Sequence, residues 1–309
     1  MASNDPEAIV NRRRLKRQLS AWRLIAIALA VGVVGAAVGR TGLWDFEGHV
    51  ARLTLDGLIV DDPARNRAIA EAGRNAAVAA LIVSIDSPGG TVVGGEALFR
   101  QLREVAAKKP VVAVMGEVAA SGGYMVALAA DQIFAREGTI TGSIGVILQS
   151  ADVTGLLDKL GVKAEAIKSA PLKAVPSPFE PLTEEARRAT KQLVDDMFDM
   201  FVDMVAERRE LPRPRALELA DGRVYTGRQA KAAGLIDAIG GEAEAREWLA
   251  GKGVRTRLPV RELRIEREDD LWRGMVRGAV ALLTGKTYLS ERLILDGLIA
   301  VWHPDLRSR

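Results

Sequence analysis

The sequence predicts an α/β domain with a mainly parallel sheet, preceded by one transmembrane helix. Short apolar runs that end at glycine or proline alternate with segments of helical periodicity, a pattern typical of parallel α/β sheets. Near the N-terminus, one uncharged stretch has the length and composition of a membrane span. Of the 309 residues, 48% are hydrophobic, which is enough for one large domain with a sizeable core.

Charge and composition exclude several functional classes. The formal net charge of +3 is too small to indicate a nucleic-acid partner, and much of the basic excess lies within residues 12–17. The chain has no cysteine, which excludes disulfides, cysteine nucleophiles and thiolate metal sites. No metal-ligand spacing, Walker A loop or dinucleotide fingerprint is present, so we expect no cofactor and no metal.

An uncharged run from Leu24 to Gly39 follows the basic cluster. Together with Ala21 and the interfacial aromatic Trp22, it reaches roughly the 17–20 residues needed to cross a hydrocarbon core. The positive-inside rule predicts a cytoplasmic tail at 1–20, a single-pass anchor at 21–40 in the inner cell membrane, and a periplasmic or other extracytoplasmic remainder. A cleaved signal peptide has the same charge layout and is the alternative.

Beyond the anchor, strand-like and helix-like segments alternate across a main domain at 47–255. Apolar runs predict strands within 49–60, 80–85, 110–115, 132–135, 139–148 and 162–168. Helical spacing predicts helices at 64–79, 91–108, 124–130, 154–160, 184–209 and, with a following strand, 225–239. Four prolines make 170–181 a loop, and Thr183 is expected to cap the next helix.

The tail at 256–309 begins charged and becomes apolar at 275–283 and 293–302. Packing on the domain, a contact within an oligomer and contact with the membrane are all compatible with this pattern. We assign the tail no role.

A serine among small residues is the first candidate for chemistry. Ser121 lies in the sequence AASGG, after a predicted buried strand and at the start of a predicted helix. Small neighbours allow a substrate backbone to approach, and free N–H groups at a helix start suit a developing oxyanion. A helix cap among residues kept small for packing explains the same pattern without catalysis.

Two other turns contain candidate residues. Gly89 and Gly90 follow a predicted strand and can turn backbone N–H groups towards a ligand. Because the carboxyl ends of neighbouring parallel strands share one crevice, we expect this turn to face the Ser121 turn. Ser143, in TGSIG, is a candidate to orient a catalytic base by a hydrogen bond. Both sequences also suit ordinary turns.

A serine nucleophile needs a base, and histidine is scarce in this chain. His49 lies beside the anchor and His303 lies in the tail. A lysine can serve when desolvation favours its neutral form. Lys173, in the proline-rich loop sequence APLKAVP, has apolar neighbours and is the best candidate, and Lys168 is a weaker rival. Most lysines are solvated surface charges.

Five stretches together resemble the signal peptide peptidase A family of membrane serine proteases. They are SIDSPGG, MGEVAASGGYMVALAAD, TGSIGV, IKSAPLKAVPSPFEPLTEEAR and RVYTGRQAKAAGLID, in the family's order. The resemblance implies a Clp-protease/crotonase-like fold of repeated β-β-α units. It also implies degradation of signal peptides left in the membrane, by a homo-oligomeric ring with its active sites inside.

The resemblance also implies roles for individual residues. Ser121 would be the nucleophile and Lys173 the general base, with Ser143 orienting the lysine. Backbone N–H groups of Gly122 and of the Gly89–Gly90 pair would hold the oxyanion.

Three positions depart from the family pattern. Leu172 replaces the usual tyrosine before the lysine, Ala174 replaces a small or acidic residue after it, and Met125 replaces a frequent aromatic. We expect these changes to alter the shape of the pocket and not the mechanism. A crotonase-like enzyme acting on acyl thioesters and a non-catalytic membrane scaffold are the alternative functions.

Overall fold

The structure is a computed structural model that describes residues 19, 22–30, 48–265 and 298–301. The chain separates into two compact units, residues 1–48 and residues 49–309.

In the first unit, residues 22–30 are helical and their side chains are exposed. Within the described ranges, no helix is both long enough and apolar enough to cross a membrane. The predicted anchor at 21–40 lies only partly within those ranges, so it stays a prediction.

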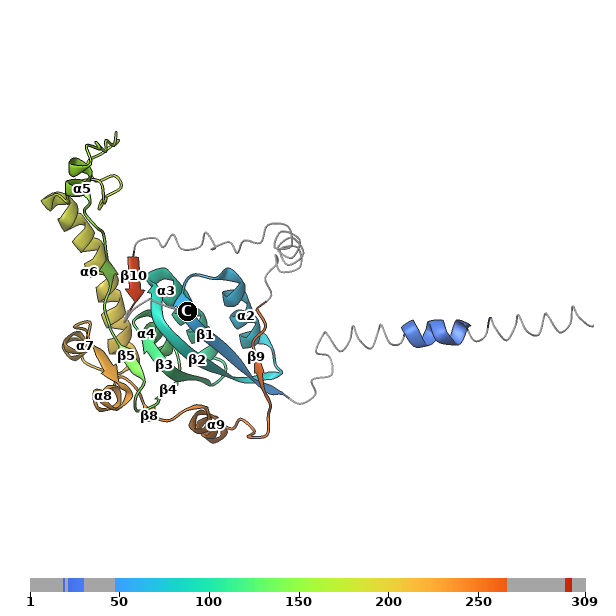
Figure 1. Ribbon diagram of the computed structural model, residues 1–309. Coiled ribbons are helices and arrows are strands. Elements are labelled where there is room, and N and C mark those ends of the chain that lie inside the picture. The colour runs from blue at the N-terminus through green and yellow to red at the C-terminus, as the bar shows by residue number, and fades with distance from the viewer. Residues whose placement is uncertain (1–18, 20–21, 31–47, 266–297, 302–309) are drawn as a thin grey trace, which may run out of the picture. The chain divides into compact units, whose positions relative to one another are not determined.

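The second unit is a mixed α/β domain (Figure 1), in which the described strands form one ten-stranded sheet. The strands are β1 (His49–Ile59), β2 (Val78–Thr91), β3 (Val111–Ala120), β4 (Gln132–Ala135), β5 (Ile140–Gly142), β6 (Ile147–Leu148), β7 (Val224–Thr226), β8 (Ala238–Ile239), β9 (Val260–Glu262) and β10 (Leu298–Val301). The helices are α2 (Pro63–Arg74), α3 (Val92–Ala106), α4 (Gly122–Ala127), α5 (Thr154–Lys159), α6 (Glu184–Arg208), α7 (Arg213–Leu219), α8 (Gly227–Ala232) and α9 (Glu242–Gly251). The predicted α/β class is confirmed.

Parallel pairing dominates the sheet, in the order β9, β1, β2, β3, β4 and β8. β3 pairs with β4 along its first half and with β5 along its second half. The pairing of β2 with β3 ends at Ser87 and Ala119. Beyond that point, the antiparallel strand β10 pairs with β2 at Gly89–Thr91, and β10 also pairs with β6. The ends of β2, β3 and β5 therefore meet at one end of the sheet, where ligands bind in open α/β sheets.

Buried side chains alternate between two hydrophobic cores, one on each face of the sheet. Val83 and Ala113 belong to a larger core that includes residues of α2, α3, α4 and α6. Ile82 and Val112 belong to a smaller core with α9. Burial on both faces explains why these strands are continuous apolar runs in the sequence.

Some predicted boundaries were wrong. β2 and β3 run past their predicted ends at Ile85 and Met115, to Thr91 and Ala120, because neighbouring strands pair with these continuations. The segment 162–168 is not a strand, and it pairs with no strand of the described sheet. Helices α7 and α9 were not predicted. Thr183 caps α6 as predicted, and its hydroxyl accepts from the Ala186 N–H at 3.2 Å.

Residues 149–182 form an arm between β6 and α6. No residue of the arm is buried. Figure 1 shows α5 and the green segment around it beyond the N-terminal end of α6, away from the sheet. The arm exposes several large apolar side chains: Leu156, Leu160, Val162, Ile167, Leu172, Phe179 and Leu182.

Candidate active site

Ser121 occupies a strained corner between β3 and α4. Its backbone has φ 53° and ψ −117°, a sparsely populated combination that costs a residue other than glycine on the order of 1–3 kcal/mol. Backbone hydrogen bonds hold this corner on both sides: the Ser121 N–H donates to the Gly142 carbonyl at 2.8 Å, and the Met125 N–H donates to the Ser121 carbonyl at 2.9 Å. Strain that is held in this way is common at functional sites.

The Ser121 side chain does not cap α4. The residue is only 1% exposed, so the hydroxyl lies within the fold. As the first residue of α4, Gly122 has an N–H group that no helical carbonyl can accept. The corner therefore has two features that suit catalysis. The serine hydroxyl is not used to cap the helix, and at least one backbone N–H beside it is not bonded within the helix.

The Ser121 turn and the Gly89–Gly90 turn lie side by side, as expected. A Cβ on Gly123 would stand 2.9 Å from the Ser87 carbonyl oxygen, so only glycine allows this approach. The Gly89 N–H donates to the Ser87 hydroxyl at 3.1 Å and is therefore already in use. Gly90 lies between Ile59 of β1 and Ala300 of β10, near the end of β2.

Ser143 lies next to Ser121 in the sheet. Gly142 is the partner of Ala120 in the parallel pairing of β3 and β5, and the two serines directly follow these residues. Ser143 also has a positive φ, 48°, and its N–H donates to the Arg223 carbonyl at 2.8 Å. The structure thus brings together four of the sequence-predicted elements: Ser121, Gly122, Ser143 and the glycine pair.

Lys173 is not part of this cluster. It lies on the arm with an exposed side chain, and no hydrogen bond or ion pair of its amine is found among the described residues. Lys168, the rival base, is engaged instead: its amine lies 2.6 Å from the Glu180 carboxylate, and its side chain is 15% exposed. Within one copy of the described chain, Ser121 and Lys173 belong to different regions.

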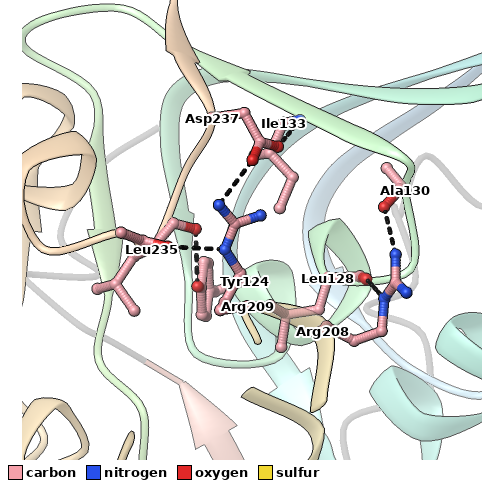
Figure 2. Close-up of polar contacts among 9 residues, drawn as sticks. Tyr124, Leu128, Ala130, Ile133, Arg208, Arg209, Leu235 and Asp237 are labelled. Carbon is pink, nitrogen blue, oxygen red and sulfur yellow. Dashed lines mark hydrogen bonds and ion pairs between the residues drawn. The ribbon is translucent and has the colours of Figure 1, made fainter. Parts of the chain in front are cut away.

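The end of α4 opposite Ser121 is fixed by arginines, which the sequence reasoning missed (Figure 2). Arg208, at the end of α6, donates to the carbonyls of Leu128 and Ala130 at 2.8 and 2.9 Å. Arg103 of α3 donates to the intervening Ala129 carbonyl at 3.0 Å. Desolvation by burial lowers the pKa of Arg208. These cations satisfy carbonyls that a helix C-terminus leaves without partners.

Tyr124 and Arg209 make a second set of contacts beside α4 (Figure 2). The Tyr124 hydroxyl is buried, donates to the Leu235 carbonyl at 2.8 Å, and has its pKa raised by desolvation. Arg209 pairs with Asp237 at 2.7 Å, and the other Asp237 oxygen accepts from the Ile133 N–H at 2.7 Å. The only signal in the sequence for these contacts is the pair Arg208 and Arg209 at the end of a long predicted helix. In the described part of the chain, no group of three or more His, Asp or Glu residues is placed to hold a metal ion.

Comparison with known proteins connects this geometry to a family. Residues 103–254 match the sequence profile of Peptidase family S49. A protein of Synechocystis sp. named as a protease is 44% identical over 55% of this chain and 62% of its own length. A protein of Enterococcus faecium named as a signal peptide peptidase, SppA, is 38% identical over 56% of this chain and 51% of its own length. The chloroplastic serine protease SPPA of Arabidopsis thaliana is 38% identical over 54% of this chain and 25% of its own length.

This chain therefore corresponds to only part of each of these relatives.

Among solved structures, the 1510-N membrane-bound stomatin-specific protease aligns with a TM-score of 0.48 at 17% identity, over 71% of this chain and 99% of its own. ClpP1 of Listeria monocytogenes aligns with a TM-score of 0.40 at 16% identity, over 62% of this chain and 91% of its own. These TM-scores are too low to establish a common fold. The sequence matches are more specific: residues 103–254 carry a Peptidase family S49 domain, and the resemblance to the signal peptide peptidase A family is confirmed.

Proposed function

We propose that the protein is a serine endopeptidase in which Ser121 is the nucleophile and Lys173 of a neighbouring copy is the general base. The observation that carries the proposal is the strained Ser121 corner, with its hydroxyl left out of helix capping and the Gly122 N–H beside it. In this proposal the domain has the Clp-protease/crotonase-like fold, and its active form is a homo-oligomeric ring.

The location of the other possible bases supports a lysine. His49 starts β1, whereas Ser121 follows β3 at the opposite end of the parallel sheet. His303 lies outside the described residues. The Lys168 amine is held by Glu180. Lys173 is the remaining candidate from the sequence, and its exposed amine has no described partner that would compete with a serine.

The arm supports a base from another copy. Seven of its large apolar side chains are exposed in the described part of the chain, and Ile167 is 99% exposed. Exposed apolar groups this numerous indicate a contact surface. If a second copy covers the arm, the Lys173 amine loses water, which favours its neutral form. Ser143, beside Ser121, would then accept or donate a hydrogen bond that orients this amine.

The chemical steps follow from this arrangement. Lys173 takes the proton of the Ser121 hydroxyl as the oxygen attacks the peptide carbonyl carbon. The Gly122 N–H, with a backbone donor from the Gly89–Gly90 turn, stabilises the oxyanion of the tetrahedral intermediate. Lys173 then gives the proton to the leaving amine, and the acyl-enzyme forms. Water, deprotonated by Lys173, hydrolyses the ester and restores Ser121.

An extended peptide is the proposed substrate. Ser121 is 1% exposed, so a substrate must displace whatever covers it, and β10 occupies the neighbouring edge of β2. We propose that the substrate pairs with Gly89–Thr91 in place of β10, antiparallel to β2. Such pairing uses backbone groups and suits unfolded peptides of varied sequence. Remnant signal peptides are the proposed natural substrates.

The proposed site of action is the outer face of the inner cell membrane. The exposed apolar side chains of the helix at 22–30, including Trp22 and Leu24, support an anchor at 21–40. The basic residues before this helix support a cytoplasmic N-terminus.

Covalent labelling of Ser121 tests the proposal. The full chain, purified in detergent, is treated with a fluorophosphonate and the adduct is located by mass spectrometry. We expect an adduct on Ser121 that is lost in Ser121→Ala and slowed on the order of a thousandfold in Lys173→Ala. Lys168→Ala is the matched control and should label at nearly the wild-type rate. An unlabelled wild-type Ser121, with peptides also left uncut, would refute the proposal.

A further inference from the structure

We propose that Asp86 and Thr139 are positioning residues that hold a bulge in β3 and thereby set the direction in which Ser121 is presented. This inference rests on the proposed role of Ser121 as the nucleophile.

The bulge lies shortly before Ser121. In the parallel pairing of β2 and β3, Ile85 is opposite Met115, and the next partners are Ser87 and Ala119. One residue of β2, Asp86, therefore faces the three β3 residues 116–118. Extra residues of this kind bend a strand and redirect the side chains that follow, and they are frequent beside active sites.

Asp86 holds the bulge from the β2 side. Its carboxylate accepts a hydrogen bond from the Val118 N–H at 3.0 Å. This bond takes the place of the backbone pairing with β2 that is interrupted at the bulge. Gly116 leaves the room for this contact, because a Cβ there would stand 3.1 Å from the Asp86 carboxyl carbon. A carboxylate is a strong and directional acceptor for a backbone donor.

Thr139 holds the same bulge from the other side. Its hydroxyl donates to the Gly116 carbonyl at 2.8 Å and accepts the Arg136 N–H at 3.0 Å. Thr139 is 2% exposed, so this contact is protected from water. Just beyond the bulge, the Thr141 hydroxyl donates to the Ala119 carbonyl at 2.7 Å. Side chains thus fix the backbone on both sides of the bulge and next to the Ser121 corner.

The exposure of the Asp86 contact separates positioning from stability. The bond between Asp86 and Val118 lies at the surface, so water can solvate the Val118 N–H when the carboxylate is removed. The free energy of unfolding should then change little. Water does not fix the direction of the strand, however, and small displacements of a nucleophile lower reaction rates steeply. The rate constant of the chemical step should therefore fall while substrate binding persists.

The experiment compares Asp86→Ala and Asp86→Asn with the control Asp56→Ala in the full-length protein. Asp56 is the β1 partner of Asp86 in the parallel pairing, so its substitution removes an equal charge from the neighbouring position. The measurements are kcat and KM for a peptide, the fluorophosphonate labelling rate of Ser121, and Tm. Thr139→Val and Thr139→Ser form a second pair on the buried side.

We expect Asp86→Ala to lower kcat and the labelling rate at least about tenfold, with KM and Tm close to those of Asp56→Ala. Asp86→Asn keeps an acceptor oxygen and should regain most of the rate, and Thr139→Ser should do so relative to Thr139→Val. Equal rates in Asp86→Ala and Asp56→Ala, or an Asp86→Asn variant as slow as Asp86→Ala, would overturn the inference. Failure of wild-type Ser121 to label would instead refute the proposed function.

Discussion

The Ser121 corner and the arm that carries Lys173 differ in almost every physical property. Ser121 is buried, its backbone is strained, and the helix after it is tied to α3 and α6 by arginines. The arm has no buried residue, and its apolar side chains face outwards. One half of the proposed catalytic pair is thus organised by the core of the domain, whereas the other half lies on a segment that has no buried residue in the described chain.

This difference shows which contacts can position each of the two side chains, Ser121 and Lys173. A nucleophile can be placed by the core of its own domain, since packing and hydrogen bonds hold it. A base on an unburied arm can be placed only by further contacts, which we propose come from a second copy. In this proposal the pair forms only in the assembled protein, and we expect isolated subunits to be inactive.

Disrupting the arm should have the largest effect. Leu160→Asp puts a charge on its apolar surface, and Leu217→Asp on α7 is the control at another exposed leucine. We expect Leu160→Asp to dissociate the oligomer and lower peptidase activity on the order of a hundredfold, with Tm of the domain changed by less than about 2 °C. Light scattering measures the size of the oligomer, and a peptide assay measures the activity. If the two variants behave alike, the arm is not a subunit contact.

Removing the arginine contacts that hold the end of α4 should have an intermediate effect. It should lower the stability of the domain as well as its activity. Arg208→Ala leaves the carbonyls of Leu128 and Ala130 without their donors, which should lower the free energy of unfolding by about 2 kcal/mol. Arg213→Ala is the control, since Arg213 also has two partners, Asp199 and Asp203, but all three are exposed. Its substitution should lower the free energy of unfolding far less than Arg208→Ala does in denaturant titrations, because exposed ion pairs contribute little to stability. A larger loss for Arg213→Ala would contradict the account of the corner.

Relieving the strain at Ser121 should have the smallest effect. Ser121→Gly and Ser121→Ala both remove the hydroxyl, but only glycine accepts φ 53° without cost. We expect Ser121→Gly to be more stable than Ser121→Ala by about 1 kcal/mol, measured by thermal or chemical unfolding. At Ser84, within β2, the order of the same two substitutions should reverse. A Ser121→Ala variant as stable as Ser121→Gly would show that the corner is not strained.

Much of the domain could be predicted from the sequence. β4 has its predicted bounds, 132–135, and α6 begins after the predicted cap at Thr183. Such elements are specified locally, by an apolar run or by a cap. The proximity of the Ser121 and Gly89–Gly90 turns was also predictable, because parallel strands end on the same side.

The remainder depends on contacts between distant residues. Strand β10 joins the sheet from far along the chain, and no local signal shows that an apolar tail will pair with Gly89–Thr91. The Arg208 contacts with α4 likewise depend on how two helices pack. The segment 162–168 has apolar residues that suit a strand, yet a strand needs a neighbouring edge. The separation of Lys173 from Ser121 could not be predicted for the same reason.

Mixing two inactive variants tests the central claim most directly. Ser121→Ala retains Lys173, and Lys173→Ala retains Ser121, so each alone should cut peptides on the order of a thousandfold more slowly than the unchanged protein. If the pair forms between copies, oligomers assembled from both variants contain some complete sites, and activity should return to a substantial fraction of the wild-type value. If mixed oligomers form, as shown by tagged subunits that purify together, and activity stays at the level of the single variants, the two residues do not act across copies and the account is wrong.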